Sequence, residues 1–542
     1  MTFTTNINRF NFGEVSPLLC ARDDLVKYAS ACSTLLNFIP LLQGPVRRRG
    51  GTRFVAAAAN YGRPVVLLEF AFSETTTYIL EAGDRYMRFY SQGERVTNGG
   101  VPYQIETPWR QADLFLETGV SALKYVQSGD VMYIVCGGQP PQKLSRHGHT
   151  DWQIAALAHW AKDDDNSRPE ARPNPTAIAL FRERLCLAAG QTIFMSQSGA
   201  FDNFKLTEVV KDNDGNVKVP IAADDPIELN VYSEQMDKIE WLCASGTLLV
   251  GTTGGEFVVG ETTSVDPLGP ENIKVVPETA FGSSPIQALR IGSVVLFVQR
   301  AGRKVREFVY DYSGDGYAAM DVTVAAEHIT KGGLRALAWQ SEPIETLWAV
   351  RSDGALLGFT YCREQDMTAW HRHSLGGNGK VSHLAVVPAV HGGQDELWLS
   401  VRREIGGEAV YYIEVMDPGY EPERGQAEAF FVDAGLSVRG EDMLEVNGLE
   451  HLEGFEVAVL ADGGVQPNRI VDGGRIELQY PADTVQVGLP YESVLCTLNL
   501  AAQLQDGSVQ GRIKRFTKVT LRLVDSCGGM AGQDLNNLAG LE

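Results

Sequence analysis

The sequence lacks most of the features that mark a metal-binding, secreted or membrane protein. Its 8 cysteines are scattered without a C-x-x-C pair, so neither a zinc ribbon nor a disulfide framework is indicated. No stretch approaches about 18 consecutive apolar residues, and residues 1–15 are polar and carry no apolar signal core. We therefore expect neither a membrane-spanning segment nor a cleavable signal peptide.

The chain also has no excess of basic residues. It carries 47 Lys and Arg against 68 Asp and Glu, a formal net charge of −21. Affinity for phosphates comes mainly from clustered Lys and Arg, so this balance argues against a protein that nucleic acid wraps around. Two interpretations stay open: an acidic surface that keeps the chain soluble, or an acidic wall past which DNA slides without binding.

No catalytic motif is recognisable. Ser352-Asp353-Gly354 has the composition of a simple turn, without the rest of an Asp-box. Gly251 to Gly255 lacks the lysine and helix of a phosphate-binding loop. The sequence therefore predicts a protein that is not an enzyme and needs no cofactor.

The candidate metal ligands are incomplete. The segment from Asp212 to Asn216 resembles the start of a calcium loop, but its twelfth position is Ala223 instead of a bidentate Glu. Two histidine pairs share a strand face without a further ligand, and one Asp run has the character of a solvated linker. These are His371 with His373, His147 with His149, and Asp163 to Asp165. We expect no metal site.

Short elements joined by turns dominate the sequence. It has 56 Gly and 24 Pro, a composition that favours β architecture over long helices. From residue 120 a unit of apolar strand, polar turn and further strands recurs, with copies that start at residues 122, 177, 239, 286, 335 and 383. Continuous apolar runs such as Val294 to Val298 favour strands covered on both faces. The repeat predicts a mainly β fold with a β-propeller of about six blades; a pair of β-sandwiches is the alternative.

Different patterns flank the repeat. Apolar residues from Leu25 to Leu36 recur at helical spacing, so residues 23–37 are expected to form one amphipathic N-terminal helix. Beyond residue 425, strands between Gly-rich turns suit a β-sandwich or barrel, and its last expected strand is Lys518 to Val524. We divide the chain into an N-terminal helix and β platform part (1–118), a propeller (119–424), a C-terminal β-domain (425–525) and a flexible tail (526–542).

One basic cluster stands out from this acidic chain. Arg47, Arg48 and Arg49 lie on a Gly-flanked turn, and Arg53 follows. Together with Asp23 and Asp24 they are candidates for a subunit interface, because guanidinium groups bind carboxylates with defined geometry. A solvated basic loop and contact with passing DNA remain as alternatives for the arginines.

Several motifs resemble those of a family of phage and prophage tail structural proteins, the nozzle proteins of short-tailed phages. The N-terminal part carries Asn11-Phe-Gly-Glu-Val-Ser-Pro17, Arg22-Asp-Asp-Leu25 and Gln43-Gly-Pro-Val-Arg-Arg-Arg-Gly-Gly-Thr-Arg-Phe54. The C-terminal part carries Gly448-Leu-Glu-His-Leu-Glu-Gly454, Val487-Gly-Leu-Pro-Tyr491 and Gln510-Gly-Arg-Ile-Lys-Arg515. Relatives have Leu at Val15, Gly at Pro45 and Pro at Gly50.

The resemblance implies a virion protein that is assembled in the host cytoplasm. It implies a homo-hexameric ring below the portal and its head-to-tail adaptor protein, with plug or tail-fibre proteins as further partners and DNA passing through the lumen without sequence-specific binding. A receptor-binding tail spike or fibre and a propeller-type glycan depolymerase are the alternatives; the depolymerase requires paired carboxylates.

Overall fold

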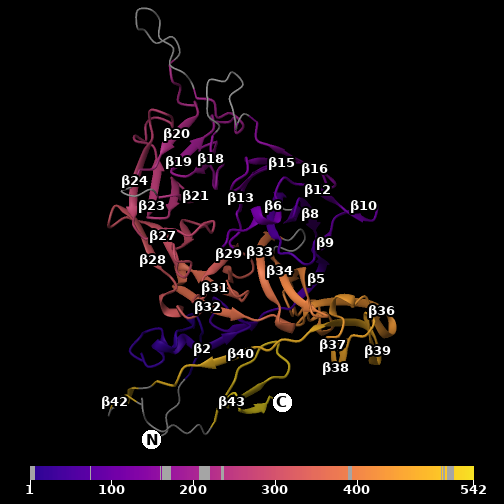
Figure 1. Cartoon of the computed structure of the whole chain (residues 1–542). Helices are drawn as coiled ribbons and strands as arrows, with labels where there is room; N and C mark the ends of the chain where they lie inside the picture. Colours follow the sequence, from indigo (N-terminus) through magenta and orange to yellow (C-terminus); the bar gives the residue numbers. More distant parts are fainter. Residues whose placement is uncertain are drawn as a thin grey trace, which may run out of the picture.

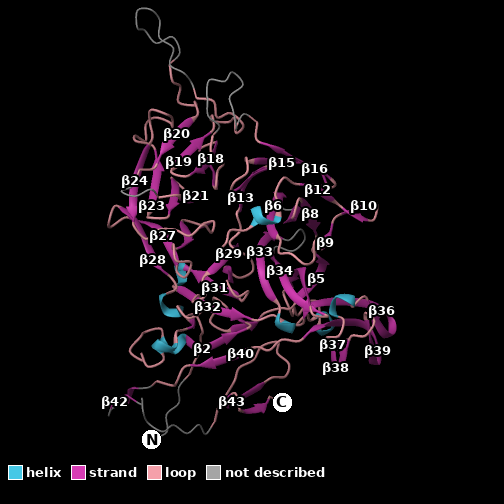
Figure 2. Ribbon diagram, in the orientation of Figure 1, coloured by secondary structure: helices cyan, strands magenta, loops and turns pink. Residues whose placement is uncertain are grey.

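The computed structural model describes residues 6–73, 75–158, 160, 172–206, 220–232, 237–388, 394–501, 503–504, 507–508 and 518–541. The chain is built almost wholly of β-strands, and the few helical segments are single turns (Figures 1 and 2). None of the helices in the described ranges is long and apolar enough to cross a membrane. The mainly β prediction is confirmed.

Seven four-stranded antiparallel units form the blades of a propeller; four of them are separate sheets, and the other three are parts of five-, seven- and eight-stranded sheets. Blades 1 to 3 consist of β6 (Val66–Ser73), β7 (Thr76–Gly83), β8 (Tyr86–Ser91) and β12 (Gln104–Glu106); β13 (Leu123–Ser128), β14 (Val131–Cys136), β15 (Gln142–Gly148) and β16 (Asp151–Ala156); and β17 (Ala177–Phe181), β18 (Arg184–Ala189), β19 (Thr192–Met195) and β20 (Ile227–Asn230). Blades 4 and 5 consist of β21 (Ile239–Ala244), β22 (Leu248–Thr252), β23 (Glu256–Gly260) and β24 (Lys274–Thr279); and β25 (Leu289–Ile291), β26 (Val294–Val298), β27 (Val305–Asp311) and β28 (Gly316–Asp321). Blades 6 and 7 consist of β29 (Leu334–Gln340), β30 (Thr346–Arg351), β31 (Leu356–Cys362) and β32 (Met367–His373); and β33 (Lys380–Pro388), β34 (Asp395–Ile405), β35 (Glu408–Met416) and β5 (Thr52–Ala57).

The first and the last blade contact each other, so that the seven blades close into a ring. Inner strands of neighbouring blades contact each other from β13 through β33 and on to β6. Blade 1 meets blade 2 where the amide of Glu69 donates to the Tyr125 hydroxyl at 3.2 Å. In blade 7 the outer strand is β5, which comes from the N-terminal part and pairs antiparallel with β35. Strands from distant parts of the chain therefore fasten the ring.

One apolar cluster lies between each pair of adjacent blades. In β26, Val294, Leu296 and Val298 pack towards blade 6, whereas Val295 and Phe297 pack towards blade 4. Because side chains alternate along a strand, both faces of the middle strands are buried and their sequences are continuously apolar. This two-sided burial explains the runs that predicted the propeller.

The ring contains one blade more than the six repeats read from the sequence. The additional blade is residues 66–106, which lie in the part expected to be the N-terminal platform. Strand β5, the outer strand of blade 7, also lies in that part. The repeats read from the sequence do not include this blade. Segments from opposite ends of the chain pair to close the propeller, and a local repeat pattern does not reveal such pairing. The propeller therefore extends further towards the N-terminus than residue 119.

The helix expected over residues 23–37 is wrong. Those residues form a 3-10 turn (Tyr28–Ser30) and then strand β2 (Ala31–Leu36). Strand β2 pairs with β1 (Gly13–Glu14) and with β40 (Val494–Thr497), so partners far along the chain override the helical spacing. In the described residues the single α-helix is α1 (Gln111–Leu114).

The C-terminal β-domain continues the sheet of blade 7. Strand β36 (Asp433–Asn447) lies parallel to β5, and β39 (Arg475–Leu489), β37 (Glu456–Ala461) and β38 (Gly464–Ile470) follow in the sheet order. The long strands β36 and β39 are irregular in register and bend around a separate apolar core. The sequence predicted a β-sandwich or barrel over residues 425–525; in the structure β36 to β39 lie in one sheet, and residues 518–524 do not belong to it.

Small elements complete the structure. The short strands are β3 (Phe38–Pro40), β4 (Val46–Arg48), β9 (Glu94–Arg95), β10 (Thr97–Asn98), β11 (Val101–Pro102), β41 (Gln503–Leu504), β42 (Gly507–Ser508), β43 (Met530–Asp534) and β44 (Asn537–Gly540). The further 3-10 turns are Pro17–Leu19, Val324–Ala326, Arg363–Gln365, Gly376–Asn378, Gln426–Glu428 and Glu450–Leu452. Figure 1 places β2, β40 and β43 together below the propeller, and we call β1, β2, β40 and the turns around them the terminal layer.

Candidate assembly site

The basic cluster lies where the N-terminal part, blade 7 and the C-terminal β-domain meet. Arg49 is buried, and all five of its N–H groups are used. It donates to both carboxylate oxygens of Asp433 at 2.8 and 2.7 Å and to Asn37, Gly50 and Ser374 at 2.7 to 3.0 Å. Burial lowers the pKa of Arg49, but attraction to Asp433 outweighs it, so the net shift is upward and the charge is retained.

A second buried ion pair joins this one. Arg403 donates to the Glu414 carboxylate at 2.7 and 3.0 Å. The Thr52 hydroxyl donates to Glu414 at 2.5 Å and lies 3.4 Å from Asp433, so it links the two pairs. We call these residues the ionic junction. It ties together β5, β34, β35 and β36, and therefore fixes the C-terminal domain on the propeller.

The neighbouring arginines bind the linker between blade 7 and β36. Arg47 donates to the carbonyl oxygens of Pro418 and Tyr420. Arg48 lies over the rings of Phe431 and Tyr491, 5.0 and 4.7 Å from their centroids. Arg53 forms an ion pair with Asp417 at 2.6 Å. All four arginines thus make contacts within the chain.

These contacts change the interface prediction. Arg49 is buried inside the chain, so its guanidinium cannot reach a neighbouring subunit, and for this residue the prediction is wrong. The solvated-loop alternative fails for Arg49 as well. For Arg47, Arg48 and Arg53, a role in a subunit interface stays a prediction.

The first signature motif attaches β1 to blade 6. Glu14 is fully buried and accepts from the amide of Leu35 at 2.8 Å, and it lies 2.8 Å from both His328 Nε2 and Arg372 Nε. Gly13 has a φ of +63°, and a Cβ there would lie 2.5 Å from the carbonyl oxygen of Trp370. No other residue fits that position without strain. The motif therefore encodes attachment to the propeller.

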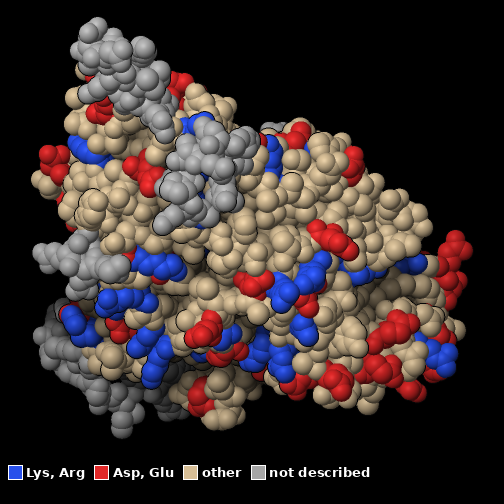
Figure 3. Space-filling model, turned by 45° about the horizontal axis from the view of Figure 1, so that its top comes forward, with Lys and Arg blue, Asp and Glu red and all other residues tan. Residues whose placement is uncertain are grey.

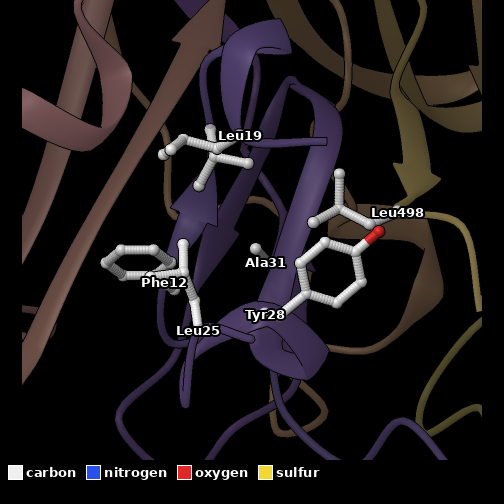
Figure 4. Close-up of a pocket in the computed structure, with 7 residues that line it drawn as sticks. Phe12, Leu19, Leu25, Tyr28, Ala31 and Leu498 are labelled. Atoms are coloured by element: carbon white, nitrogen blue, oxygen red, sulfur yellow. The ribbon is translucent and has the colours of Figure 1, made fainter. Parts of the chain in front are cut away.

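Exposed apolar side chains gather around the terminal layer. Leu18 and Val26 are 86% and 94% exposed. Beside them is a shallow apolar hollow with no room for a water molecule, where Leu498 from the C-terminal part lies next to Tyr28 (Figure 4). It is lined by Phe12, Val15, Leu19, Leu25, Tyr28, Ala31 and Leu498. Asp24 is exposed and pairs with Arg22 at 2.7 Å, so Asp23 and Asp24 adjoin this hollow in the sequence but take no part in the ionic junction.

The C-terminal β-domain has a strongly acidic surface. Between residues 439 and 483 its exposed carboxylates far outnumber its arginines, which are Arg439, Arg469 and Arg475. The exposed carboxylates are Glu441, Asp442, Glu445, Glu450, Glu453, Glu456, Asp462, Asp472, Glu477 and Asp483. Acidic and basic side chains are mixed on the face shown in Figure 3, so the acidic excess is not uniform over the molecule.

The histidine pairs have structural partners. His371 Nδ1 lies 2.7 Å from His373 Nε2, and burial lowers the pKa of His371 to about 3. His149 lies 3.0 Å from the Tyr78 hydroxyl. Among the described residues no group of three or more His, Cys, Asp or Glu could hold a metal ion. The segment from Asp212 to Asn216 and the run Asp163 to Asp165 lie outside those residues.

Lys124 occupies the inside of the propeller. This residue of β13 is buried and donates to the carbonyl oxygen of Glu240 in β21, so it reaches from blade 2 to blade 4. Burial lowers the pKa of Lys124 to about 7. Its side chain fills space near the axis, which is where a depolymerase of this fold would need paired carboxylates.

Sequence reasoning missed the acidic partners of the basic cluster. Asp433 is 384 residues from Arg49, and Glu414 lies in the middle of an apolar strand. A charged residue between apolar neighbours, as in Tyr412-Ile-Glu-Val415, is the signal that could have found Glu414, because a buried charge requires a partner.

The chain was compared with known proteins. Residues 174–425 match the family model described as bacteriophage nozzle protein. No curated protein matches. Solved structures with some similarity include the Neurospora crassa Pan2 WD40 domain, with a TM-score of 0.38 at 11% identity, where the alignment covers 69% of this chain and 96% of that one. U3-55K gives 0.40 at 10% identity, covering 68% and 98%, and Chaetomium thermophilum Raptor gives 0.39 at 12%, covering 69% and 29%.

The structural similarities are too low to carry an argument. The family match, in contrast, covers most of the propeller and agrees with the motifs at both ends of the chain. The resemblance read from the sequence is confirmed: residues 174–425 of this chain match the bacteriophage nozzle protein family, and the match supports a structural protein of a phage tail.

Proposed function

We propose that the chain assembles into a closed ring of six copies in a short phage tail, below the portal and its adaptor protein. The ring retains the packaged genome, together with a plug protein, and conducts DNA during ejection. The observation that carries this proposal is the family match. Closed symmetry gives a chain of this kind a mechanical role, because copies that surround an axis create a conduit that no single copy has.

The ionic junction suits each subunit to this role. A ring closes only when every copy has the same angle between its interfaces. Buried, fully bonded ion pairs hold one arrangement of the propeller and the C-terminal domain, because leaving either charge unpaired is costly. The junction thus supplies a rigid subunit with one fixed shape.

We propose that the acidic C-terminal β-domain, which contains β36 to β39, forms the wall of the lumen. Six copies carry a formal charge of about −126 in total, and carboxylates that face the lumen repel the phosphates of passing DNA. The duplex then slides without sticking. Propeller blades on the outside of the ring are the proposed attachment sites for tail fibres.

Native mass spectrometry of the purified full-length chain tests the ring. The proposal predicts a dominant species of six chains, and a persistent monomer or a trimer contradicts it.

The lumen is tested separately with phage that carries Glu445→Lys, Glu450→Lys and Glu453→Lys. Slower DNA ejection is expected from assembled particles. A matched triple reversal of exposed propeller acids, at Glu183, Glu271 and Asp315, serves as the control, and equal ejection rates for both variants would reject the acidic lumen.

A further inference from the structure

The C-terminal arm, residues 518–541, has little contact with the rest of the chain. All of its residues are exposed except Ala531 and Leu541, which are partly buried. Its large apolar side chains are 39% to 81% exposed: Val519, Leu521, Leu523, Val524, Met530, Leu535 and Leu538. Its strands β43 and β44 form a two-stranded hairpin of their own. Such a hairpin is marginally stable in water, so the arm requires a surface to cover it.

The first part of the arm has the sequence of a strand but no partner strand. In residues 518–524, Val519, Leu521 and Leu523 alternate with Lys518, Thr520 and Arg522, which is the period of a strand with one apolar face. The sequence therefore predicted a strand here. In the structure these residues join no sheet of the described chain.

Strand β40 offers the complementary feature. It is the last strand in the order β29-β30-β31-β32-β1-β2-β40, so its outer edge pairs with no described strand. Its residues Val494 to Thr497 include no proline and no charge, the devices that usually protect an edge. The other free edge near the C-terminus, β38, carries Pro467 and is protected in this way.

The surroundings of β40 fit the apolar face of the arm. The apolar hollow that contains Leu498 follows directly after β40, and Leu18 and Val26 stand exposed on the turns that line it. The arm and β40 lie at the same end of the molecule (Figure 1).

We propose that residues 518–524 add a strand to the free edge of β40 in a neighbouring copy of this chain. Val519, Leu521 and Leu523 then cover the apolar hollow and the exposed Leu18 and Val26. Main-chain hydrogen bonds supply affinity, as in other cases of strand addition. Every copy both donates an arm and accepts one, so the contact is head-to-tail and repeats until the ring closes. This inference rests on the proposed ring and names the contact that holds it.

Cysteine cross-linking tests the contact directly. Cys496 lies on β40 and is partly buried, whereas Cys527 is exposed. In a full-length Cys527→Ser chain, Val519→Cys, Leu521→Cys and Leu523→Cys are introduced one at a time and oxidised. At least one is expected to form a disulfide with Cys496 of the partner subunit, seen as a ladder of linked chains. Cross-links only within single chains, or none at all, would overturn the proposal.

An assembly measurement separates this inference from the proposed function. Val519→Asp, Leu521→Asp and Leu523→Asp together are expected to weaken ring formation about tenfold or more, with the melting temperature of the monomer unchanged. The matched control changes three exposed apolar residues of the propeller, Val265→Asp, Tyr312→Asp and Val324→Asp, and is expected to form rings normally. Rings formed equally well by the arm variant reject the arm contact but keep the proposed function. A wild-type chain that never forms rings rejects both.

Discussion

The propeller and the terminal segments are stabilised in different ways. Between its blades the propeller buries continuous apolar clusters that involve strands adjacent in the sequence. The terminal layer has a small apolar cluster and is attached by buried ion pairs and a close glycine contact. The C-terminal arm, residues 518–541, carries exposed apolar residues. The difference shows that the propeller core is complete within one chain, whereas the C-terminal arm leaves apolar side chains uncovered, which on our proposal a neighbouring copy covers.

The largest effect on stability is expected from Asp433→Ala. The change leaves Arg49 buried without its counter-ion, which costs about 3–5 kcal/mol. Hydrogen exchange followed by mass spectrometry should show faster exchange in β5 and in β36 to β39, with blades 2 to 5 nearly unchanged. Uniformly faster exchange throughout the propeller would show that the two regions are not stabilised separately. Asp433→Asn, which keeps the shape, is the matched control and is expected to cost less.

A substitution in the propeller core should increase hydrogen exchange in the blades instead of in the C-terminal β-domain. Leu296→Ala removes a fully buried side chain from the cluster between blades 5 and 6, at a cost of about 3 kcal/mol. Exchange should increase in those blades first, and the ring of assembled chains should keep its number of copies. A change in that number would connect the propeller core to assembly and contradict the comparison.

Lys124 gives the propeller a predicted pH dependence. Its pKa is lowered to about 7 by burial, while an unfolded chain keeps the proton up to about pH 10.4. Between these values unfolding takes up a proton, so stability contributed by this site rises with pH and the penalty is full below pH 7. Lys124→Met should therefore raise the melting temperature at pH 7 and have less effect at pH 10. An equal effect at both pH values would show that Lys124 does not titrate in this range.

The smallest effect is expected from an exposed ion pair. Arg22 and Asp24 are more than half exposed, so water and salt screen their attraction. Asp24→Ala should leave the melting temperature of the isolated chain unchanged in a thermal scan. A clear drop would mean that the terminal layer depends on surface charge as well as on buried pairs.

The sequence predicted the strands and turns that depend on local residue patterns. Apolar runs bounded by turns located strands such as β21, β22 and β26 because both faces of these strands are buried in the same way. Ser352-Asp353-Gly354 forms the expected turn between β30 and β31. Gly254-Gly255 likewise turns between β22 and β23.

Contacts between distant residues could not be predicted in this way. Closure of the ring by β5, the pairing of β2 with β40 and the ion pair of Arg49 with Asp433 join segments hundreds of residues apart. The same cause explains the wrong helix over residues 23–37, whose spacing fits a helix until the partner strands are known. Arg49 was read as an exposed turn because its counter-ion lies in another domain.

An image reconstruction of the intact phage tail tests the central claim most directly. The account predicts six copies of this chain around the tail axis, below the portal and adaptor, with the β36–β39 domain facing the path of the DNA. A single copy, or a trimer attached away from the path of the DNA, would contradict it.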